Sequence, residues 1–241
     1  MKAIIMAGGY AKRLWPLTKD KAKPLLPVGG KPMIDYIWGE MKGLDLETIY
    51  VSTNELFAQQ FQEWIDSKND SRLVLAVEKT LSEEEKLGAI GAIDLLIETY
   101  GIDDDLMIVA GDNLTEMKFS GFVGSFDSRP LVALYDLGDK SKAANKYGVV
   151  ETNGDLVVGF EEKPAEPKTS LISSGFYVYP KETLPMFKEY LAEGNSKDAP
   201  GFFLAWLHKK TDVKAYVFSD LWYDIGDLES YEKANQIFSG N

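Results

Sequence analysis

Short apolar runs alternate with amphipathic stretches along the first 110 residues. The apolar runs are rich in Ile, Val and Leu and have the length of buried strands: residues 4–6, 49–51, 73–75 and 107–109. The stretches between them have the apolar spacing of helices: residues 33–42, 56–65 and 90–98. This alternation predicts a parallel sheet covered by helices, with ligands beyond the carboxyl ends of the strands.

The pattern changes near residue 131. Residues 132–134, 147–152 and 156–160 are strand-like, with a hairpin turn at Asn153-Gly154-Asp155, and an amphipathic helix begins near Asp227. We therefore predict an α/β fold: a single Rossmann-like, doubly wound mixed sheet with helices on both faces and a small antiparallel addition. Residues 1–241 are expected to form one domain of two halves, divided near residue 130.

Composition restricts the chemistry. The chain has no cysteine and one histidine, so a metal ion must be held by oxygen ligands. There is no apolar run of membrane-spanning length and no signal peptide, so we expect a cytoplasmic protein without a membrane partner. A net charge of -12 disfavours nucleic acid, yet residues 1–32 carry seven lysines and arginines against one aspartate.

A glycine loop lies in this basic segment. Gly8 and Gly9 follow the first strand and precede Lys12 and Arg13, so backbone amides could cradle phosphate oxygens. A tight turn with solvated cations is the alternative, and the spacing matches neither the Walker loop nor the dinucleotide fingerprint. The loop continues through a proline-stiffened, structureless stretch to residue 33, and long rigid loops in compact domains are usually functional.

Three motifs in this segment closely resemble the signature of sugar-phosphate nucleotidylyltransferases. They are Ala7-Gly8-Gly9; Arg13-Leu14 with Pro16-Leu17-Thr18; and Lys23-Pro24-Leu25-Leu26-Pro27-Val28 with Lys31-Pro32-Met33. The resemblance, nearest to the glucose-1-phosphate thymidylyltransferase group, implies a Mg²⁺-dependent enzyme that joins a nucleoside triphosphate to a hexose 1-phosphate and releases pyrophosphate. It also implies a nucleotide-binding half of about residues 1–130 and a sugar-phosphate-binding half of about residues 131–241.

The resemblance assigns roles to the basic residues. The loop with Ala7, Gly8 and Gly9 would wrap the triphosphate, Arg13 would contact the β and γ phosphates, and Lys23 the reacting phosphates. In-line attack on an α-phosphate needs charge neutralisation of the leaving pyrophosphate more than it needs a covalent nucleophile.

Two aspartates are expected to hold the metal. Asp112 follows the strand-like run 106–110, where a turn or helix-capping aspartate is the alternative, and Asp224 lies far along the chain. The resemblance assigns both as Mg²⁺ ligands. Magnesium takes one or two protein carboxylates together with phosphates and water.

The sugar side is expected between these aspartates. By resemblance Gly148, Glu162, Lys163 and Ser174 contact the hexose and its phosphate, with Lys163 also counted among the catalytic groups. A solvated strand end is the alternative for the Glu-Glu-Lys-Pro sequence. The aromatic residues from 176 to 179 are expected in the core.

The resemblance places the nucleobase near Glu78 and Gly88. Thymidylyl and uridylyl enzymes often have glutamine where Glu78 stands, and the loop here is several residues longer. A carboxylate accepts the N3–H of thymine or uracil and equally the N1–H and amino group of guanine. We predict dTTP and glucose 1-phosphate as substrates, with UTP or GTP and glucose or mannose 1-phosphate as the alternative.

Two other functions compete. A non-catalytic sugar-nucleotide sensor would keep the fold, but retention of the charged set argues against it. A nicotinamide dehydrogenase would need an acid after the second strand, which residues 51–54 do not supply. The resemblance is compatible with a homo-oligomer, and we expect no β-helix or acyltransferase domain after the terminal helix.

Overall fold

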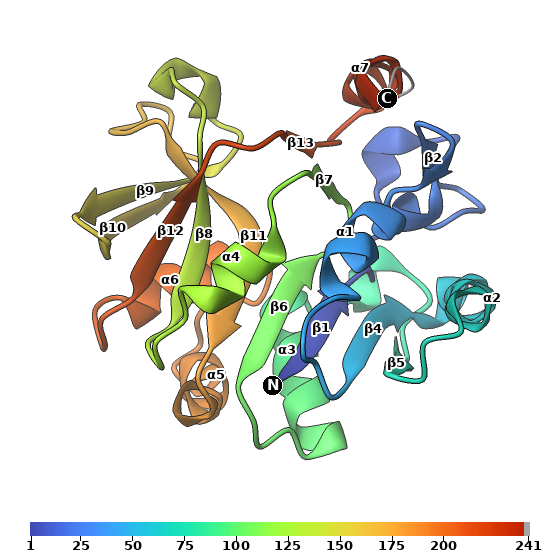
Figure 1. Cartoon of the computed structure of the whole chain (residues 1–241), viewed down its shortest axis with the longest axis horizontal. Coiled ribbons are helices and arrows are strands. Elements are labelled where there is room, and N and C mark those ends of the chain that lie inside the picture. Colours follow the sequence, from blue (N-terminus) through green and yellow to red (C-terminus); the bar gives the residue numbers. More distant parts are fainter. Residues whose placement is uncertain (239–241) are drawn as a thin grey trace. The chain divides into compact units, whose positions relative to one another are not determined.

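The structure is a computed structural model that describes residues 1–238 (Figure 1). Its residues pack into two compact units that interleave along the chain. Unit 1 comprises Met1–Lys86, Val109–Ser120 and the segment that begins at Asp220. Unit 2 comprises Leu87–Ile108 and Gly121–Ser219. The two halves predicted from the sequence, divided near residue 130, are functional halves and not packing units. They stay a prediction.

Unit 1 is built on parallel strands. β4 (Ile49–Asn54) lies between β1 (Lys2–Met6) and β5 (Leu73–Glu78) and pairs with both in parallel (Figure 1). Every residue of β4 is buried, as expected for a central parallel strand. Helices α1 (Ile34–Met41) and α2 (Ala58–Lys68) confirm the first two helices that the sequence predicts.

The remaining strands of unit 1 are short. β2 (Pro27–Val28) and β3 (Lys31–Pro32) form an antiparallel hairpin, which was expected to be structureless. β7 (Asn113–Thr115) pairs with β13 (Trp222–Asp224). Single 3₁₀ turns complete the loops: η1 (Lys12–Leu14), η2 (Lys23–Leu25), η3 (Glu55–Phe57) and η4 (Glu83–Glu85). The C-terminal helix α7 (Leu228–Phe238) begins where predicted.

Two elements carry the chain between the units: β6 (Leu106–Ala110) and α4 (Phe119–Gly124). The strands of unit 2 follow the order β11-β8-β12-β10-β9. Their bounds are Leu131–Asp136 for β8, Gly148–Asn153 for β9, Leu156–Glu162 for β10, Leu171–Tyr179 for β11 and Lys214–Phe218 for β12. β8 and β12 are parallel, whereas β9 with β10 and β8 with β11 are antiparallel.

The mixed α/β class is confirmed, and so is the hairpin turn between β9 and β10. Antiparallel pairing is more extensive than the small addition expected, because β11 pairs with both β8 and β9. The helices of unit 2 are α3 (Ala89–Tyr100), α5 (Pro185–Ala192) and α6 (Pro200–Leu207), with 3₁₀ turns η5 (Lys140–Ala143) and η6 (Lys181–Thr183).

Aromatic side chains form much of the unit 2 core. Phe187 of α5 stacks on Phe203 of α6 with ring centroids 4.0 Å apart, and Tyr179 of β11 meets both rings edge-on. Such pairs add to the gain from burial of their area. Phe176 and Tyr177 are also buried, which confirms that these aromatics belong to the core. Within residues 1–238, no helix has the length and apolarity needed to cross a membrane.

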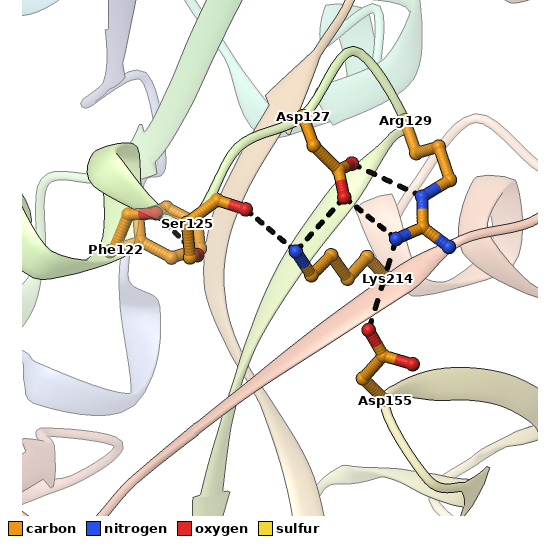
Figure 2. Close-up of polar contacts among 6 residues, drawn as sticks. All are labelled: Phe122, Ser125, Asp127, Arg129, Asp155 and Lys214. Carbon is orange, nitrogen blue, oxygen red and sulfur yellow. Dashed lines mark hydrogen bonds and ion pairs between the residues drawn. The ribbon is translucent and has the colours of Figure 1, made fainter.

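A charged cluster in unit 2 binds Lys214, the first residue of β12 (Figure 2). Asp127 accepts hydrogen bonds from Arg129 at 2.7 Å and from Lys214 at 3.0 Å, while Lys214 also donates to the Ser125 carbonyl. Arg129 and Lys214 hold the pKa of Asp127 well below its usual range. Asp155, in the β9–β10 turn, lies 3.8 Å from Arg129. The cluster therefore connects the α4–β8 loop, the β9–β10 turn and the first residue of β12.

Candidate functional site

The glycine loop is held from one side by β4. Ala7 donates its backbone N–H to Ser52, and the Asn54 side chain donates to the Gly8 carbonyl at 2.9 Å. A Cβ atom placed on Gly9 would meet nothing within 4 Å among residues 1–238. Packing within the chain therefore does not require glycine at residue 9, whereas close approach of a ligand to the backbone would.

The loop then turns through a strained residue. Ala11 has a φ of 45° and a ψ of 45°, a left-handed conformation that costs about 1–2 kcal/mol for a residue with a Cβ. Thr18 stabilises it by donating to the Ala11 carbonyl at 2.8 Å. Arg13 follows in η1 with an exposed side chain, and within residues 1–238 its guanidinium has no hydrogen-bond or ion-pair partner. Five donors are thus available to an anion.

Lys12 pairs with an acidic turn and is also exposed to solvent. Its Nζ lies 3.1 Å from carboxylate oxygens of both Glu83 and Glu84 in η4. Hydrogen bonds to Glu83 and Glu84 raise the pKa of Lys12. All three side chains are substantially exposed, so the arrangement is a surface ion pair of modest strength.

The shortest of the site's ion pairs joins Lys23 to Asp112. Nζ lies 2.7 Å from Oδ2, and the Lys23 side chain is only 9% exposed. Asp112 is placed by Gly111, whose N–H donates to the Met6 carbonyl at the end of β1. A Cβ on Gly111 would lie 2.8 Å from the Ile5 side chain, so this tight approach of the turn to β1 requires glycine.

Asp224 belongs to the strand next to Asp112. In the β7–β13 ladder Asp224 stands opposite Asn113, the residue after Asp112. One carboxylate lies in the turn before β7 and the other at the end of β13, and both have the oxygen ligands that Mg²⁺ prefers. In the described residues no group of three or more His, Cys, Asp or Glu side chains is arranged to hold a metal ion.

Glu78 connects to the glycine loop through two hydroxyls that the sequence analysis missed. Tyr10 donates to Thr80 at 3.3 Å, and Thr80 donates to the Glu78 carboxylate at 3.3 Å. Burial raises the pKa of Tyr10, so its phenol stays protonated and can act as donor. No local pattern indicates this relay, because Tyr10 and Thr80 are 70 positions apart.

Gly88 has a packing role in unit 2. Its φ is +78°, and a Cβ there would lie 2.5 Å from the Lys197 carbonyl oxygen. That carbonyl accepts the Ile90 N–H at 3.0 Å and so caps the start of α3. These contacts account for glycine at residue 88, and its contact to a nucleobase stays a prediction.

Gly148 and Glu162 are paired across the β9–β10 ladder. A Cβ on Gly148 would lie 2.4 Å from the Phe160 ring and 3.0 Å from Glu162 Oε2, and one on Gly201 would lie 2.7 Å from the same oxygen. The Glu162 side chain is 17% exposed, and burial raises its pKa while nearby Lys163 lowers it. Sequence reasoning missed Phe160 and Gly201.

Lys163 and Ser174 differ in accessibility. Lys163 has a left-handed φ of 48°, a 58% exposed side chain, and an Nζ 3.8 Å from Glu162. A strained lysine beside a buried carboxylate is the kind of outlier that motivates a functional hypothesis. Ser174 is 1% exposed and its hydroxyl donates to the Ala133 carbonyl at 2.9 Å. Its predicted sugar contact remains untested.

Each unit thus gathers part of the predicted site. The residues predicted to bind phosphate, metal or base that lie in unit 1 are Ala7, Gly8, Gly9, Arg13, Lys23, Glu78, Asp112 and Asp224. Unit 2 contains Gly88 together with the sugar-side residues Gly148, Glu162, Lys163 and Ser174.

Two curated relatives span nearly the whole chain. One, from Sulfolobus acidocaldarius, is named as a candidate mannose-1-phosphate guanyltransferase; it is 32% identical over 235 residues, covering 98% of this chain. The other, a glucose-1-phosphate adenylyltransferase from Geobacillus stearothermophilus, is 28% identical over 253 residues, covering 97% of this chain. The chain spans 62% of the first relative's length and 64% of the second's.

Solved structures share the fold. A candidate glucose-1-phosphate thymidylyltransferase from Bacillus anthracis, in complex with a sucrose, superposes with a TM-score of 0.84 at 25% identity, covering 100% of this chain and 96% of that one. A UDP-glucose pyrophosphorylase bound to UDP-glucose gives 0.81 at 19% identity, covering 99% and 98%, which shows the fold alone. The family model described as nucleotidyl transferase matches residues 2–239, and the chain therefore belongs to the nucleotidyl transferase family.

Proposed function

We propose that the chain transfers a nucleotidyl group from a nucleoside triphosphate to a hexose 1-phosphate and releases pyrophosphate. The observation that carries the proposal is the 2.7 Å pair of Lys23 with Asp112, together with the β7–β13 ladder, in which Asp224 stands opposite Asn113, the residue after Asp112. It accompanies a glycine loop that presents Arg13 without a partner among residues 1–238. The names of the relatives, all sugar-1-phosphate nucleotidyltransferases, support the same reaction.

The cations of unit 1 suit a triphosphate. Backbone amides at Gly8 and Gly9 would cradle its oxygens, and the Arg13 guanidinium would neutralise the leaving pyrophosphate. Lys23 would hold the reacting phosphate while its ammonium stays fixed by Asp112. Asp112 and Asp224 would hold Mg²⁺, which supplies Lewis-acid polarisation of the phosphate when bound.

Unit 2 supplies groups that suit a sugar phosphate. The Glu162 carboxylate would accept hydrogen bonds from a pair of sugar hydroxyls, and the Lys163 ammonium would bind the attacking phosphate. Neither group needs to form a covalent bond, because orientation and charge carry a single in-line displacement.

For the substrates, we propose dTTP and glucose 1-phosphate, as the resemblance in the N-terminal motifs favours. The name of the Bacillus anthracis structure agrees with this pair. GTP and mannose 1-phosphate are the second candidate, favoured by the 32% identical relative and by Glu78. A carboxylate can accept both the N1–H and the amino group of guanine.

The test is pyrophosphate release with Mg²⁺ across a grid of five nucleoside triphosphates and four hexose 1-phosphates. The triphosphates are dTTP, UTP, GTP, CTP and ATP; the sugars are glucose, mannose, galactose and N-acetylglucosamine. Release restricted to dTTP with glucose 1-phosphate supports the first pair, and release restricted to GTP with mannose 1-phosphate supports the second. A folded sample that binds nucleotide but releases no pyrophosphate would contradict the transferase and favour a sensor. Asp112→Asn is the matched inactive control.

A further inference from the structure

The unit 1 elements that carry charged site residues share one apolar cluster. Its buried members are Leu14, Leu26, Val28, Met33, Leu114, Ile225, Ala234 and Phe238. Four of these lie within three residues of Arg13, Lys23, Asp112 and Asp224 along the chain. The cluster therefore lies next to all four charged residues along the chain.

Helix α7 contributes two members of this cluster. Ala234 is fully buried, and Phe238 is 5% exposed with its ring edge-on to Tyr36 of α1, centroids 5.1 Å apart. Gly29, in the turn between β2 and β3, packs so closely that a Cβ there would lie 2.4 Å from the Phe238 carbonyl oxygen. The end of α7 thus fits against the β2–β3 hairpin with no room for a side chain.

Hydrogen bonds fasten the same hairpin. Tyr231 of α7 donates to the Pro27 carbonyl at 2.7 Å, and Asn235 accepts the Gly29 N–H at 3.3 Å. From α1, Tyr36 donates to the Val28 carbonyl at 3.0 Å. The two successive carbonyls of β2 therefore each accept a hydrogen bond from a tyrosine hydroxyl, one from α7 and one from α1.

The segment before Lys23 is fastened separately. Gln60 of α2 accepts the Ala22 N–H at 3.2 Å and donates to the Asp20 carbonyl at 3.0 Å. The chain is therefore held by hydrogen bonds on both sides of Lys23. On the N-terminal side they come from α2, and on the C-terminal side they join α7 to the β2–β3 hairpin.

We infer that α7 is a positioning element of the unit 1 site: through Tyr231, Asn235 and Phe238 it fixes the hairpin that follows Lys23. Through Ile225 in the same cluster it also fixes the strand that carries Asp224. The inference rests on the proposed function for its kinetic consequence, but its structural part does not depend on turnover.

The expected kinetic signature is specific. Loosening the hairpin lets Lys23 and Asp224 move relative to the glycine loop, and misplacement of about 1 Å can reduce a rate by about 100-fold. The segment that leads to Arg13 has its own hydrogen bonds. Thr18 donates to the Ala11 carbonyl, and Asn54 donates to the Gly8 carbonyl. We therefore expect kcat to fall while KM for the triphosphate changes little.

The test compares a double variant, Tyr231→Phe with Asn235→Ala, with Lys233→Ala as control. Lys233 lies on the same helix with a 58% exposed side chain paired to Glu229. We expect the double variant to remain folded, to exchange backbone amide hydrogens faster across residues 20–28 and 221–226, and to lose kcat by roughly 10-fold or more. The control should match the parent protein in all three measurements. Exchange and kcat equal to the control's would overturn the inference.

Two variants of Phe238 that differ in severity separate an effect on positioning from loss of the fold. Phe238→Leu keeps an apolar side chain and should retain most of kcat, whereas Phe238→Ala should accelerate exchange in the same two segments. Equal exchange in Phe238→Leu and Phe238→Ala would contradict the positioning role. If the parent protein releases no pyrophosphate, the proposed function fails, and hydrogen exchange alone decides the inference.

Discussion

Two lysine–carboxylate pairs of the predicted site, one in each unit, differ sharply. Lys23 and Asp112 are 2.7 Å apart, and the lysine side chain is 9% exposed. Lys163 and Glu162 are 3.8 Å apart, and that lysine side chain is 58% exposed. In the first pair the lysine is buried, whereas in the second the lysine is exposed and the carboxylate is partly buried.

The difference indicates different tasks. A buried lysine is tolerated only with a well-placed partner, so the Lys23–Asp112 geometry is fixed before any ligand arrives. A 3.8 Å pair whose lysine is exposed contributes about 1 kcal/mol or less, so Lys163 can leave Glu162 for a phosphate at little cost. Under the proposed function, Lys23 would serve the chemical step and Lys163 the capture of the sugar phosphate.

The largest expected effect comes from breaking the buried pair or its neighbour. Lys23→Ala, Asp112→Asn and Asp224→Asn should each lower kcat by about 100-fold to 1000-fold, because each removes charge stabilisation from the reacting phosphates. Asparagine keeps an acceptor for the Lys23 ammonium, so Asp112→Asn should stay folded by circular dichroism. Rates near those of the parent protein in both aspartate variants would rule out the metal assignment.

A change at the second pair, Lys163 with Glu162, should alter KM for the sugar phosphate more than kcat. Lys163→Ala removes a charge-assisted contact to the sugar phosphate, so we expect KM for that substrate to rise about 10-fold or more, with kcat changed less. Steady-state pyrophosphate release at varied sugar phosphate measures both constants. A kcat loss as large as that of Lys23→Ala would show that Lys163 acts in the chemical step.

Glu162 offers a stability test of the same comparison. Burial raises its pKa above the ordinary value of a glutamate, so its ionised form is disfavoured in the folded state. The penalty is absent below the unfolded-state pKa and appears as pH rises through the folded-state pKa. Glu162→Gln should therefore raise the melting temperature at pH 7 by a few degrees while reducing activity. A stabilisation that persisted unchanged below pH 4.5 would show that it does not come from ionisation.

The smallest effect is expected at the acidic turn. Replacing Glu83 and Glu84 with glutamine releases Lys12 from two exposed ion pairs, so KM for the triphosphate should fall by no more than about 3-fold. The effect should shrink in high salt, since screening already weakens the parent pairs. An increase in KM would mean that the acidic turn assists nucleotide binding.

Local sequence pattern was sufficient for the regular elements and insufficient for the contacts between them. The alternation of apolar runs predicted β1, α1, β4 and α3 because it records burial of one face or of both. The β2–β3 hairpin was missed because its strands have two residues each and depend on the hydroxyls of Tyr36 and Tyr231. Tyr231 lies 204 positions from its partner Pro27.

The site residues show the same limit. The motif resemblance predicted Lys23, Asp112 and Asp224 as site residues. In unit 1, Lys23 contacts Asp112, and Asp224 stands opposite the residue after Asp112. The resemblance could not indicate Thr80 or Gln60, whose roles come only from which loop each one reaches. Side chains that hold a loop in place carry no signature of their own, because many residue types can donate or accept one hydrogen bond.

The interleaving of the units has a consequence for biosynthesis. Residues 1–86 leave the ribosome long before β13 and α7 exist, so the apolar surface around Val28 and Met33 stays uncovered while unit 2 is being made. We expect unit 2 to become protease-resistant in nascent chains halted once residue 219 has emerged, and unit 1 only after residue 238; resistance of both at the earlier point would contradict this order. Lys23 would then acquire its final surroundings only after β13 and α7 have been synthesised.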